Sequence, residues 1–562
     1  MVTYADKTWQ RHYRLGPYPI AKSKQPYPEL SLPDLLDHSA LNYPDRPAIF
    51  FLERKMNYVE LKLAVDRLAT ALADMGVQKG DKVATVIPNC PQFVISDFAI
   101  MKIGGVHVPC SILHKASDLI WEIGSSGARV VICQDASLDI INSIKDEAKI
   151  EKVIVTDPME YSAAGAERRE VPGAVQFRDL LEEFEAEPPE VEINPKEDLS
   201  DVVFTGGATG LPKGVMKTHY IRVTNVMQAF AWALEPLAPG IKGRSSILVP
   251  IPLFHDYGHA VLHFCVYWGL QLMLMQDPRD ADMLQQLLER FRPLMCTCVP
   301  TQYTRVLPKG LVRTQTCFMS AAQALAPEVE MAVERQTGMP VTEAYGLTET
   351  GPLSHLNLSA FAKITGFAPE VKTNSIGVPI VDVDSKIVDP DTGEDVPIGK
   401  EGEIWVRSPS NMLGYWPEPG QGLKDGWLPT GDIGRMEQDG YFYLTDRVKD
   451  MANISGLKVY TRLVDDAIYE LPAVGDAVTI GIPDPERPGS ERLKAFIRLK
   501  RGYEGKLTPE EVIEHCKEKL PPYAVPKLVE MSTEELPLTV TEKLFKRALR
   551  DREIKKMKKK AG

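Results

Sequence analysis

A glycine-rich stretch in the first half of the chain reads Val203-Phe204-Thr205-Gly206-Gly207-Ala208-Thr209-Gly210-Leu211-Pro212-Lys213-Gly214-Val215. Its four glycines and two threonines directly follow a predicted strand, and they supply backbone N–H and hydroxyl donors that suit a polyphosphate. A P-loop would need glycine, four residues, and then Gly-Lys-Ser/Thr. Lys213 follows Pro212 and precedes Gly214, so that template fails. Alone, the stretch predicts either a phosphate cradle or a structural turn.

The surrounding sequence alternates between helix and strand patterns. Apolar residues recur at helical spacing from Leu61 to Met75, Gly76 suits a left-handed cap, and residues 82–87 then form a predicted strand. The same alternation returns further along the chain, at 130–133, at 152–155, and at 283–291 followed by 294–299. This order favours a mostly parallel, doubly wound sheet.

Length and composition indicate a large globular protein. The 562 residues are 44% hydrophobic and 25% charged, with room for roughly three to four domain-sized units. Collagen-like, disordered and disulfide-scaffold classes are excluded.

The longest apolar run, 261–275, contains His263 and Gln271 and is shorter than the ~18 residues of a membrane span, so we expect a buried element. Residues 1–16 lack a signal-peptide core, and the expected location is cytoplasmic.

Cysteine and charge patterns exclude further classes. The eight cysteines are too sparse for a disulfide framework, and Cys296 and Cys298 share a face of a predicted strand, so we expect reduced core thiols. The net charge of −12 argues against generic nucleic-acid binding. The charge is uneven, because residues 543–562 hold ten Lys or Arg against Asp551 and Glu553. We expect a solvated final helix there.

The pattern changes in the last third of the chain. From about residue 376 to 446, short strands and frequent turns predict a β-rich subdomain. A smaller unit of mixed helix and strand follows. The predicted fold class is therefore α/β: a large N-terminal domain, 1–448, holds two doubly wound α/β subdomains plus the β-rich one, and a small α+β C-terminal domain spans 449–562.

Five motifs resemble those of the adenylate-forming superfamily, which includes acyl-CoA synthetases, peptide-synthetase adenylation domains and beetle luciferases. The 205–214 run resembles its phosphate loop, with Ala208 where a hydroxyl residue is commoner. The others follow in the family's order: Pro252-Leu253-Phe254-His255, Tyr345-Gly346-Leu347-Thr348-Glu349, Thr430-Gly431-Asp432 and Asp446-Arg447-Val448-Lys449-Asp450. The resemblance spans about 31–552 and implies a mobile C-terminal domain.

The resemblance implies roles for residues that would otherwise have ordinary structural explanations. Tyr345, otherwise a core aromatic, would stack on adenine. Thr348 and Glu349, otherwise a helix start, would contact phosphate and hold Mg²⁺, which prefers oxygen ligands. Asp432, otherwise a turn residue, would accept both ribose hydroxyls, and Arg447 would also contact the ribose.

A second group of implied roles concerns the C-terminal domain. The segment 536–543 resembles the one whose lysine, here Lys543, bridges the substrate carboxylate and the α-phosphate. The sequence departs from the family at Glu542, where glycine usually precedes the lysine, and at Thr461, where proline usually follows Lys458-Val459-Tyr460. Lys449 falls at the family's hinge, and Gly456 would admit the pantetheine arm.

Three histidines, His255, His259 and His263, recur every four residues and allow a metal stripe on one helix face. Asp256 is the only carboxylate that we expect near them. The match of 252–255 to the family's acyl-pocket gate favours a pocket instead, with His259 and His263 lining it or packing. The predicted pocket, formed by 255–263, 299–303 and 320–323, contains no Lys or Arg and fits an apolar tail.

The predicted site has four groups of residues. They are, as catalytic residues, Lys543, Thr348, Glu349 and His255; as nucleotide and coenzyme A contacts, Thr205, Gly206, Gly207, Ala208, Thr209, Gly210, Lys213, Ser320, Ala321, Ala322, Glu343, Ala344, Tyr345, Gly346, Asp432, Tyr443, Arg447, Gly456, Leu457 and Lys458; as metal ligands, Glu349 and Thr209; and as hinge, Lys449.

The function that this resemblance implies is an AMP-forming carboxylic acid–CoA ligase that uses ATP, Mg²⁺ and coenzyme A. The runs 276–280, 446–451 and 523–530 are most similar to the branch acting on medium-chain and long-chain fatty acids. Three alternatives stay open: an aromatic or alicyclic acid, loading of a separate carrier protein, and nucleotide binding without catalysis. Peripheral membrane contact and a monomer or homodimer also stay open, and we expect no nucleic-acid partner.

Overall fold

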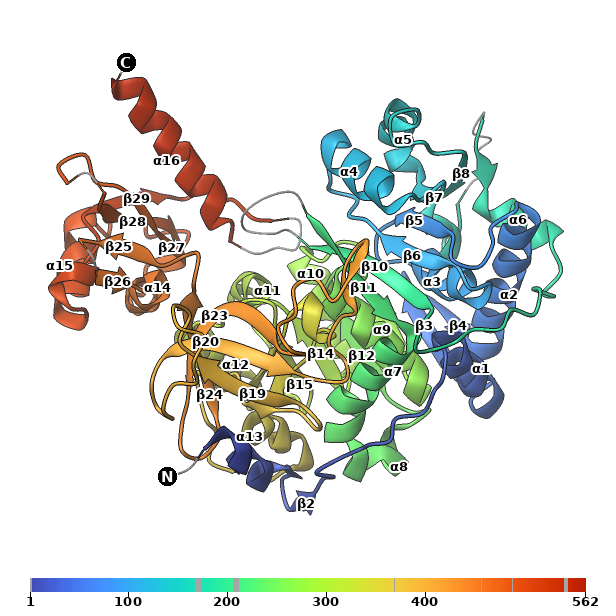
Figure 1. Ribbon diagram of the computed structural model, residues 1–562, viewed down its shortest axis with the longest axis horizontal. Helices are drawn as coiled ribbons and strands as arrows, with labels where there is room; N and C mark the ends of the chain where they lie inside the picture. Colours follow the sequence, from blue (N-terminus) through green and yellow to red (C-terminus); the bar gives the residue numbers. More distant parts are fainter. Residues whose placement is uncertain are drawn as a thin grey trace.

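The computed structural model describes residues 3–166, 173–205, 212–367, 369–455, 457–487, 489–539 and 544–561. The chain forms a large N-terminal domain and a small C-terminal domain, which lies at the left of Figure 1 and ends in helix α16 (Lys546–Ala561). The predicted α/β class, with a β-rich subdomain, is confirmed. In these ranges, no helix has the length and apolar character needed to cross a membrane.

The first α/β layer is a nine-stranded sheet with a parallel centre and antiparallel strands at one edge. The glycine-rich stretch connects two of its antiparallel strands, in which Thr205 pairs with Lys213. Across the sheet the strands are β22 (Glu418–Pro419), β21 (Gly414–Tyr415), β11 (Lys213–Thr218), β10 (Leu199–Thr205), β6 (Val106–Pro109), β5 (Lys82–Val86), β7 (Val130–Gln134), β8 (Lys152–Thr156) and β9 (Val175–Gln176).

The helices of this layer follow the predicted alternation. Helix α2 (Tyr58–Asp74) begins with a capping box, in which Asn57 and Glu60 each accept the other's backbone N–H, and Gly76 follows it with φ +88°. The predicted helix and the strand after it are thereby confirmed. The remaining helices are α3 (Pro91–Lys102), α4 (Ala116–Ser126), α5 (Leu138–Ile144) and α6 (Phe177–Glu183).

The second layer is another nine-stranded sheet, again parallel at its centre. Its strands, in order, are β18 (Val378–Pro379), β17 (His355–Leu356), β16 (Val341–Tyr345), β15 (Cys317–Ser320), β14 (Met295–Cys298), β12 (Ser246–Val249), β13 (Gln271–Leu274), β3 (Pro47–Phe51) and β4 (Arg54–Asn57). Its main helices are α1 (Leu32–Asn42), α7 (His219–Val226), α9 (Asp256–Trp268), α10 (Ala281–Phe291), α11 (Pro300–Val306) and α12 (Pro327–Thr337). The apolar run 261–275 is buried, as predicted.

Asp97 links the two layers through a fully buried polar network. Its Oδ1 accepts hydrogen bonds from His107 Nδ1 (2.7 Å) and His259 Nε2 (2.9 Å), and its Oδ2 accepts one from His263 Nε2 (2.9 Å). Burial alone would raise the pKa of Asp97, but the imidazoles hold it well below its usual value. The expectation that Asp256 is the only carboxylate near these histidines is therefore wrong, because Asp97 reaches them from a distant helix.

Of the predicted histidine stripe, His259 and His263 pack in this network. Asp97, His259 and His263 present ligand atoms within 4.8 Å of one another, a spacing that would also suit a metal. Their separations are those of hydrogen bonds, so the network already satisfies the buried carboxylate. All eight cysteines are buried and free, as predicted, and the Sγ atoms of Cys296 and Cys298 lie 3.6 Å apart.

The β-rich subdomain is an antiparallel sheet of β19 (Asp384–Val388), β20 (Gly402–Arg407), β23 (Leu428–Met436) and β24 (Phe442–Arg447). The C-terminal domain has its own apolar core. Its elements are β25 (Ala452–Ile454), β26 (Leu457–Val459), α14 (Thr461–Tyr469), β27 (Val474–Pro483), β28 (Glu491–Leu499), α15 (Pro509–Lys519), β29 (Leu528–Ser532) and α16. Lys449 lies in the turn between β24 and β25. The domain boundary placed there stays a prediction.

The two domains meet at Asp446, near the end of β24. Its Oδ2 accepts a hydrogen bond from the Thr461 hydroxyl at 3.2 Å, and Arg462 donates to the carbonyl of Leu444 at 2.7 Å. Lys546 of α16 donates to the same Thr461 hydroxyl at 2.8 Å and lies 3.2 Å from Asp465. Thr461, where the family usually has proline, thus connects both domains.

Candidate active site

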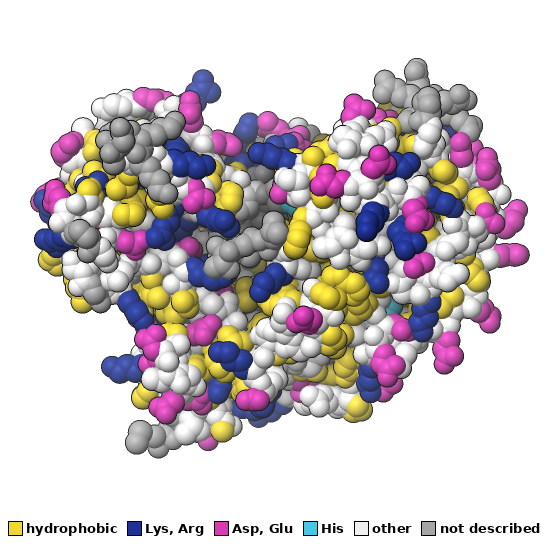
Figure 2. Space-filling view, turned by 45° about the horizontal axis from the view of Figure 1, so that its top comes forward, with side chains coloured by type: hydrophobic (Ala, Val, Ile, Leu, Met, Phe, Trp, Pro, Cys, Tyr) yellow, Lys and Arg dark blue, Asp and Glu magenta, His cyan; other side chains and the backbone are white. Residues whose placement is uncertain are grey.

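A cavity of about 980 Å³ lies between the two domains. It is bounded by the carboxyl ends of β10, β15 and β16, by α7 and α9, and by residues 538–539 and 544–547 of the C-terminal domain. Figure 2 shows the hollow between the domains, with Lys and Arg side chains beside it. Ligands of α/β proteins bind at such carboxyl ends of strands.

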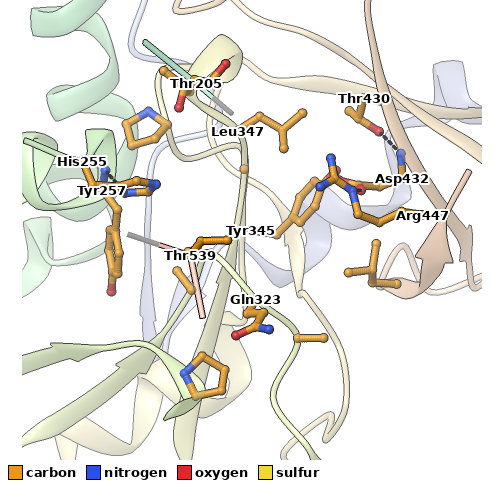
Figure 3. A pocket seen from close by; sticks show the side chains of 18 of the residues that line it. Thr205, His255, Tyr257, Gln323, Tyr345, Leu347, Thr430, Asp432, Arg447 and Thr539 are labelled. Carbon is orange, nitrogen blue, oxygen red and sulfur yellow. Dashed lines mark hydrogen bonds and ion pairs between the residues drawn. The ribbon is translucent and has the colours of Figure 1, made fainter. Parts of the chain in front are cut away.

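Three side chains from different strands meet on one wall of this cavity. The Tyr345 hydroxyl donates to Asp432 Oδ2 at 2.8 Å, and Arg447 Nε donates to Asp432 Oδ1 at 2.9 Å. Asp432 and Arg447 are directly paired residues of β23 and β24, which explains their contact. In Figure 3 the Tyr345 ring lies between these two residues and the Thr205–His255 side of the cavity. An aromatic face beside a buried carboxylate suits a base and its ribose hydroxyls.

The backbone after Tyr345 has no room for larger residues. A Cβ on Gly346 would lie 1.9 Å from the carbonyl oxygen of Pro352. This close approach lets the chain turn directly into the short helix η8 (Thr348–Thr350), which brings Thr348 and Glu349 onto the cavity wall.

Glu349 is held by a residue that the sequence did not indicate. The Tyr415 hydroxyl donates to Glu349 Oε1 at 2.7 Å, and the ammonium group of Lys213 lies 4.6 Å from the centroid of the Tyr415 ring. Nothing in the local sequence around Tyr415 points to this role, because it is formed between residues of different elements. Lys213, Tyr415 and Glu349 all line the cavity.

One of the two predicted magnesium ligands, Glu349, lies in the described part of the chain. It offers hard carboxylate oxygens on the cavity wall, and its Oε2 accepts no hydrogen bond from the described residues. That donor type fits Mg²⁺. Thr209, the second predicted ligand, lies outside the described residues, as do Gly206, Gly207, Ala208, Gly210, Gly456 and Lys543.

The residues on either side of two of these gaps do lie at the cavity. Thr205 and Lys213, which end β10 and begin β11, line it. Thr539 and Leu544, which flank the segment containing Lys543, also line it, and Leu538 and Leu544 form an antiparallel bridge. The C-terminal domain therefore approaches the cavity with this bridged pair of residues.

Several other predicted contacts lie just after strand β15 or within strand β16. Ala321, Ala322, Glu343 and Ala344 line the cavity, and Ala322 has φ +70°. Burial raises the pKa of Glu343 to about 7, and its Oε1 accepts the backbone N–H of Leu325. The remaining member, Ser320, is buried outside the cavity lining.

Three predicted contacts lie away from the cavity wall in this arrangement of the domains. The Tyr443 hydroxyl donates to Glu437 at 3.3 Å. Leu457 is 49% exposed, and Lys458 pairs with Asp391 at 3.3 Å. His255 and Lys449 do line the cavity, whereas His259 and His263 do not.

An apolar part of the cavity lies between α7 and α9. Its wall includes Phe254, Tyr257, Ala260 and Phe264 from the α9 side, together with residues that follow α7. The cationic residues described on the cavity wall come from β11 and from the interdomain region: Lys213, Arg447, Lys449, Arg462, Lys546 and Arg547. The acyl pocket predicted from the sequence stays a prediction, and it did not include Val226, Ala229 or Phe230, which also line this part of the cavity.

A comparison with protein families decides what this arrangement is. The model of the AMP-binding enzyme family matches residues 36–416, and that of the AMP-binding enzyme C-terminal domain matches residues 463–543. The chain belongs to the AMP-binding enzyme family. The resemblance to adenylate-forming enzymes is thereby confirmed.

Relatives of this AMP-binding enzyme match over nearly its whole length. A long-chain-fatty-acid–CoA ligase of Bacillus subtilis (strain 168) is 32% identical and covers 94% of this chain and 95% of its own. One of Yersinia pestis is 31% identical, covering 98% and 99%. The solved anthranilate CoA ligase AuaEII, in complex with anthranoyl-AMP, has a TM-score of 0.81 at 25% identity, covering 94% and 98%. The expected AMP-forming acid–CoA ligase is confirmed at this level.

Proposed function

We propose that this AMP-binding enzyme activates an apolar, medium-chain or long-chain carboxylic acid with ATP and transfers the acyl group to coenzyme A. One observation carries the proposal: the apolar wall between α7 and α9 opens into the same cavity as Tyr345, Asp432 and Arg447. A tail bound on that wall would direct its carboxylate toward the nucleotide. Pockets with apolar walls and few polar groups are typical of such ligands.

In the proposed first half-reaction, a carboxylate oxygen attacks the α-phosphorus, the bond from that phosphorus to the bridging oxygen breaks, and pyrophosphate leaves. Tyr345 and Asp432 would hold the nucleoside, while Lys543 would lie between the two reacting anions and reduce their repulsion. Mg²⁺, held by Glu349 and Thr209, would neutralise charge on the phosphates.

In the proposed second half-reaction, the thiol sulfur attacks the acyl carbonyl carbon, AMP leaves, and the thiol proton passes to solvent. Lys543 has no role here, so the C-terminal domain would rotate about Lys449. The placement of Leu457 and Lys458 away from the cavity supports this rotation, because strand β26 must move to reach the acyl-adenylate. The free, buried cysteines fit a reducing compartment, so a cytoplasmic setting is part of the proposal.

The test is AMP release measured over a panel of straight-chain, aromatic and alicyclic acids, with and without coenzyme A. Acid-dependent AMP release and a thioester with free coenzyme A are expected, strongest with straight chains. Preference for aromatic acids would support the second candidate, which the similarity to an anthranilate CoA ligase favours. A product formed only with a carrier protein would contradict CoA ligation. If no acid led to AMP release, nucleotide binding without catalysis would be the remaining function.

A further inference from the structure

The helix that borders the apolar wall contains an irregular turn. Helix α7 continues into a π-helical turn, η5 (Met227–Ala231), in which Ala229 has the non-helical angles φ −84° and ψ −113°. The helix is therefore kinked at Ala229, and the side chains on either side of the kink point in directions that a regular helix would not give them. Val226, Ala229 and Phe230 all line the cavity. The irregular turn and the residue before it therefore present three side chains within five residues to the same space.

Helix α9 faces this turn and shows how far the apolar space extends. His255, Tyr257, Ala260 and Phe264 line the cavity at successive helical positions. At a rise of 1.5 Å per residue, the nine steps from His255 to Phe264 correspond to about 13 Å. One turn further, Trp268 is outside the lining and packs against Phe264, with ring centroids 5.2 Å apart. The space along α9 thus ends at Phe264.

The last lining residues of the two helices contact each other. The ring centroids of Phe230 and Phe264 lie 5.4 Å apart with an angle of 49° between the rings. Their exposed fractions are 3% and 0%, although both contribute to the cavity wall. Two buried rings in contact close the space between the helices. Tilted aromatic pairs of this kind also stabilise their own geometry.

We propose that Phe230 and Phe264 form the end wall of the acyl channel and limit the enzyme to straight chains of about ten to twelve carbons. This inference rests on the proposed function. An extended chain advances about 1.2 Å per bond, the value implied by 3.3–3.6 Å per three-bond residue. About eleven bonds therefore span the ~13 Å between the gate at His255 and the wall at Phe264.

The experiment measures kcat/KM for CoA-dependent AMP release over straight-chain acids of about four to about eighteen carbons. Phe264→Leu and Phe230→Leu remove part of the wall, so the preferred chain should lengthen, with about a fourfold gain per newly buried methylene. Ala260→Met fills the channel one turn before the wall and should shift the preference to shorter chains. Phe177→Leu, which alters a fully buried ring of α6 outside the cavity lining, is the matched control and should leave the profile unchanged.

The outcomes separate this inference from the proposed function. An unchanged chain-length profile in both Phe264→Leu and Ala260→Met, with AMP release retained, would overturn the end wall. Undiminished activity of the unaltered enzyme on chains of about sixteen carbons or more would overturn it too. Failure of the proposed function is distinct, because then no acid would release AMP. If the phenylalanine variants fail to fold, Ala260→Met alone decides, since a shift to shorter chains supports the channel and an unchanged profile refutes it.

Discussion

Tyr345 and Asp432, 87 positions apart in the sequence, are joined by a 2.8 Å hydrogen bond from the phenol hydroxyl to Oδ2 of the carboxylate. Arg447 Nε donates a hydrogen bond to the other carboxylate oxygen, Oδ1. Burial, and then the Asp432 charge, raises the pKa of Tyr345 well above its ordinary value, so the hydroxyl keeps its proton and the bond persists. The ring and the acid are consequently held in position before any nucleotide arrives.

Asp432→Asn should weaken ATP binding more than Tyr345→Phe does. The first change removes a charged acceptor, for which a loss of about 1.5–3 kcal/mol corresponds to a KM for ATP raised roughly tenfold to more than a hundredfold. The second removes one neutral donor and should raise the KM only a few-fold. Acid-dependent exchange of pyrophosphate into ATP measures both. Tyr13→Phe, at a buried tyrosine outside the cavity lining, is the control. An ATP KM unaffected by Asp432→Asn would contradict the ribose role.

Lys543→Ala should abolish acid-dependent pyrophosphate exchange while thioester formation from supplied acyl-adenylate continues nearly unchanged. The reason is that a cation between two anions is needed only when carboxylate and α-phosphate approach each other. Lys546→Ala is not a suitable control, because Lys546 contacts Thr461 and Asp465. Lys555→Ala, on the same final helix, is the suitable control. Equal loss of both steps in Lys543→Ala would refute the assignment.

Thr461→Val should slow adenylation relative to thioester formation. The Thr461 hydroxyl donates to the buried Asp446 carboxylate and accepts a hydrogen bond from the partly exposed Lys546, so valine leaves both charged groups without this partner. The lost hydrogen bonds would destabilise the arrangement in which residues 538–539 and 544–547 line the cavity, by about 1–3 kcal/mol. Single-turnover rates of the two half-reactions provide the measurement. If both rates fell by the same factor, the contact would have only a structural role.

Asp97→Ala should lower the free energy of unfolding by about 3–5 kcal/mol, the usual consequence of removing one partner from a buried charged network. Three imidazoles would lose their common acceptor. Asp37 is a suitable comparison, because its side chain is 42% exposed while it pairs with Lys62 and Lys102, and Asp37→Ala should cost less than about 1 kcal/mol. Urea denaturation followed by circular dichroism compares them, and similar losses for both variants would count against the network.

Stability should fall as pH decreases from about 6.5 toward 4, in part through two buried histidines. Burial lowers the pKa of His219 to about 4 and that of His355 to about 3. In this window the unfolded chain takes up protons at these positions and the folded chain does not, so acid favours unfolding. At pH 5 the loss is about 2 kcal/mol for each histidine. The double variant His219→Asn, His355→Asn should lose less stability between pH 7 and pH 5 than the unaltered protein, and an equal loss would contradict this assignment.

Local patterns in the sequence were sufficient for much of the fold. The apolar spacing in α2, its cap at Gly76 and the strand β5 depend on neighbouring residues, and the alternation that they begin predicts the α/β layers. Contacts between distant segments could not be derived in this way. Asp97 lies 162 positions from His259, and Tyr415 lies 66 positions from Glu349, and neither residue has a local pattern that indicates its partner.

The same limit applies to the acyl side of the site. Most residues of α7 and η5 are buried, so no polar face marks which side chains line the cavity. The π-helical turn then changes the face on which the following residues lie, and a calculation at 100° per residue would assign Phe230 incorrectly. Family motifs indicated the residues that we predict to contact the nucleotide, because those residues form short runs of sequence.

The π-helical turn has a consequence for how this protein could diverge. The non-helical angles of Ala229 set the direction of the chain on either side of it, and they place Ala229 and Phe230 on the cavity wall. A substitution that changes the backbone at Ala229 would therefore move Phe230 without altering Tyr345, Asp432 or Arg447. The apolar wall and the polar wall of the cavity are thus separable targets for sequence change.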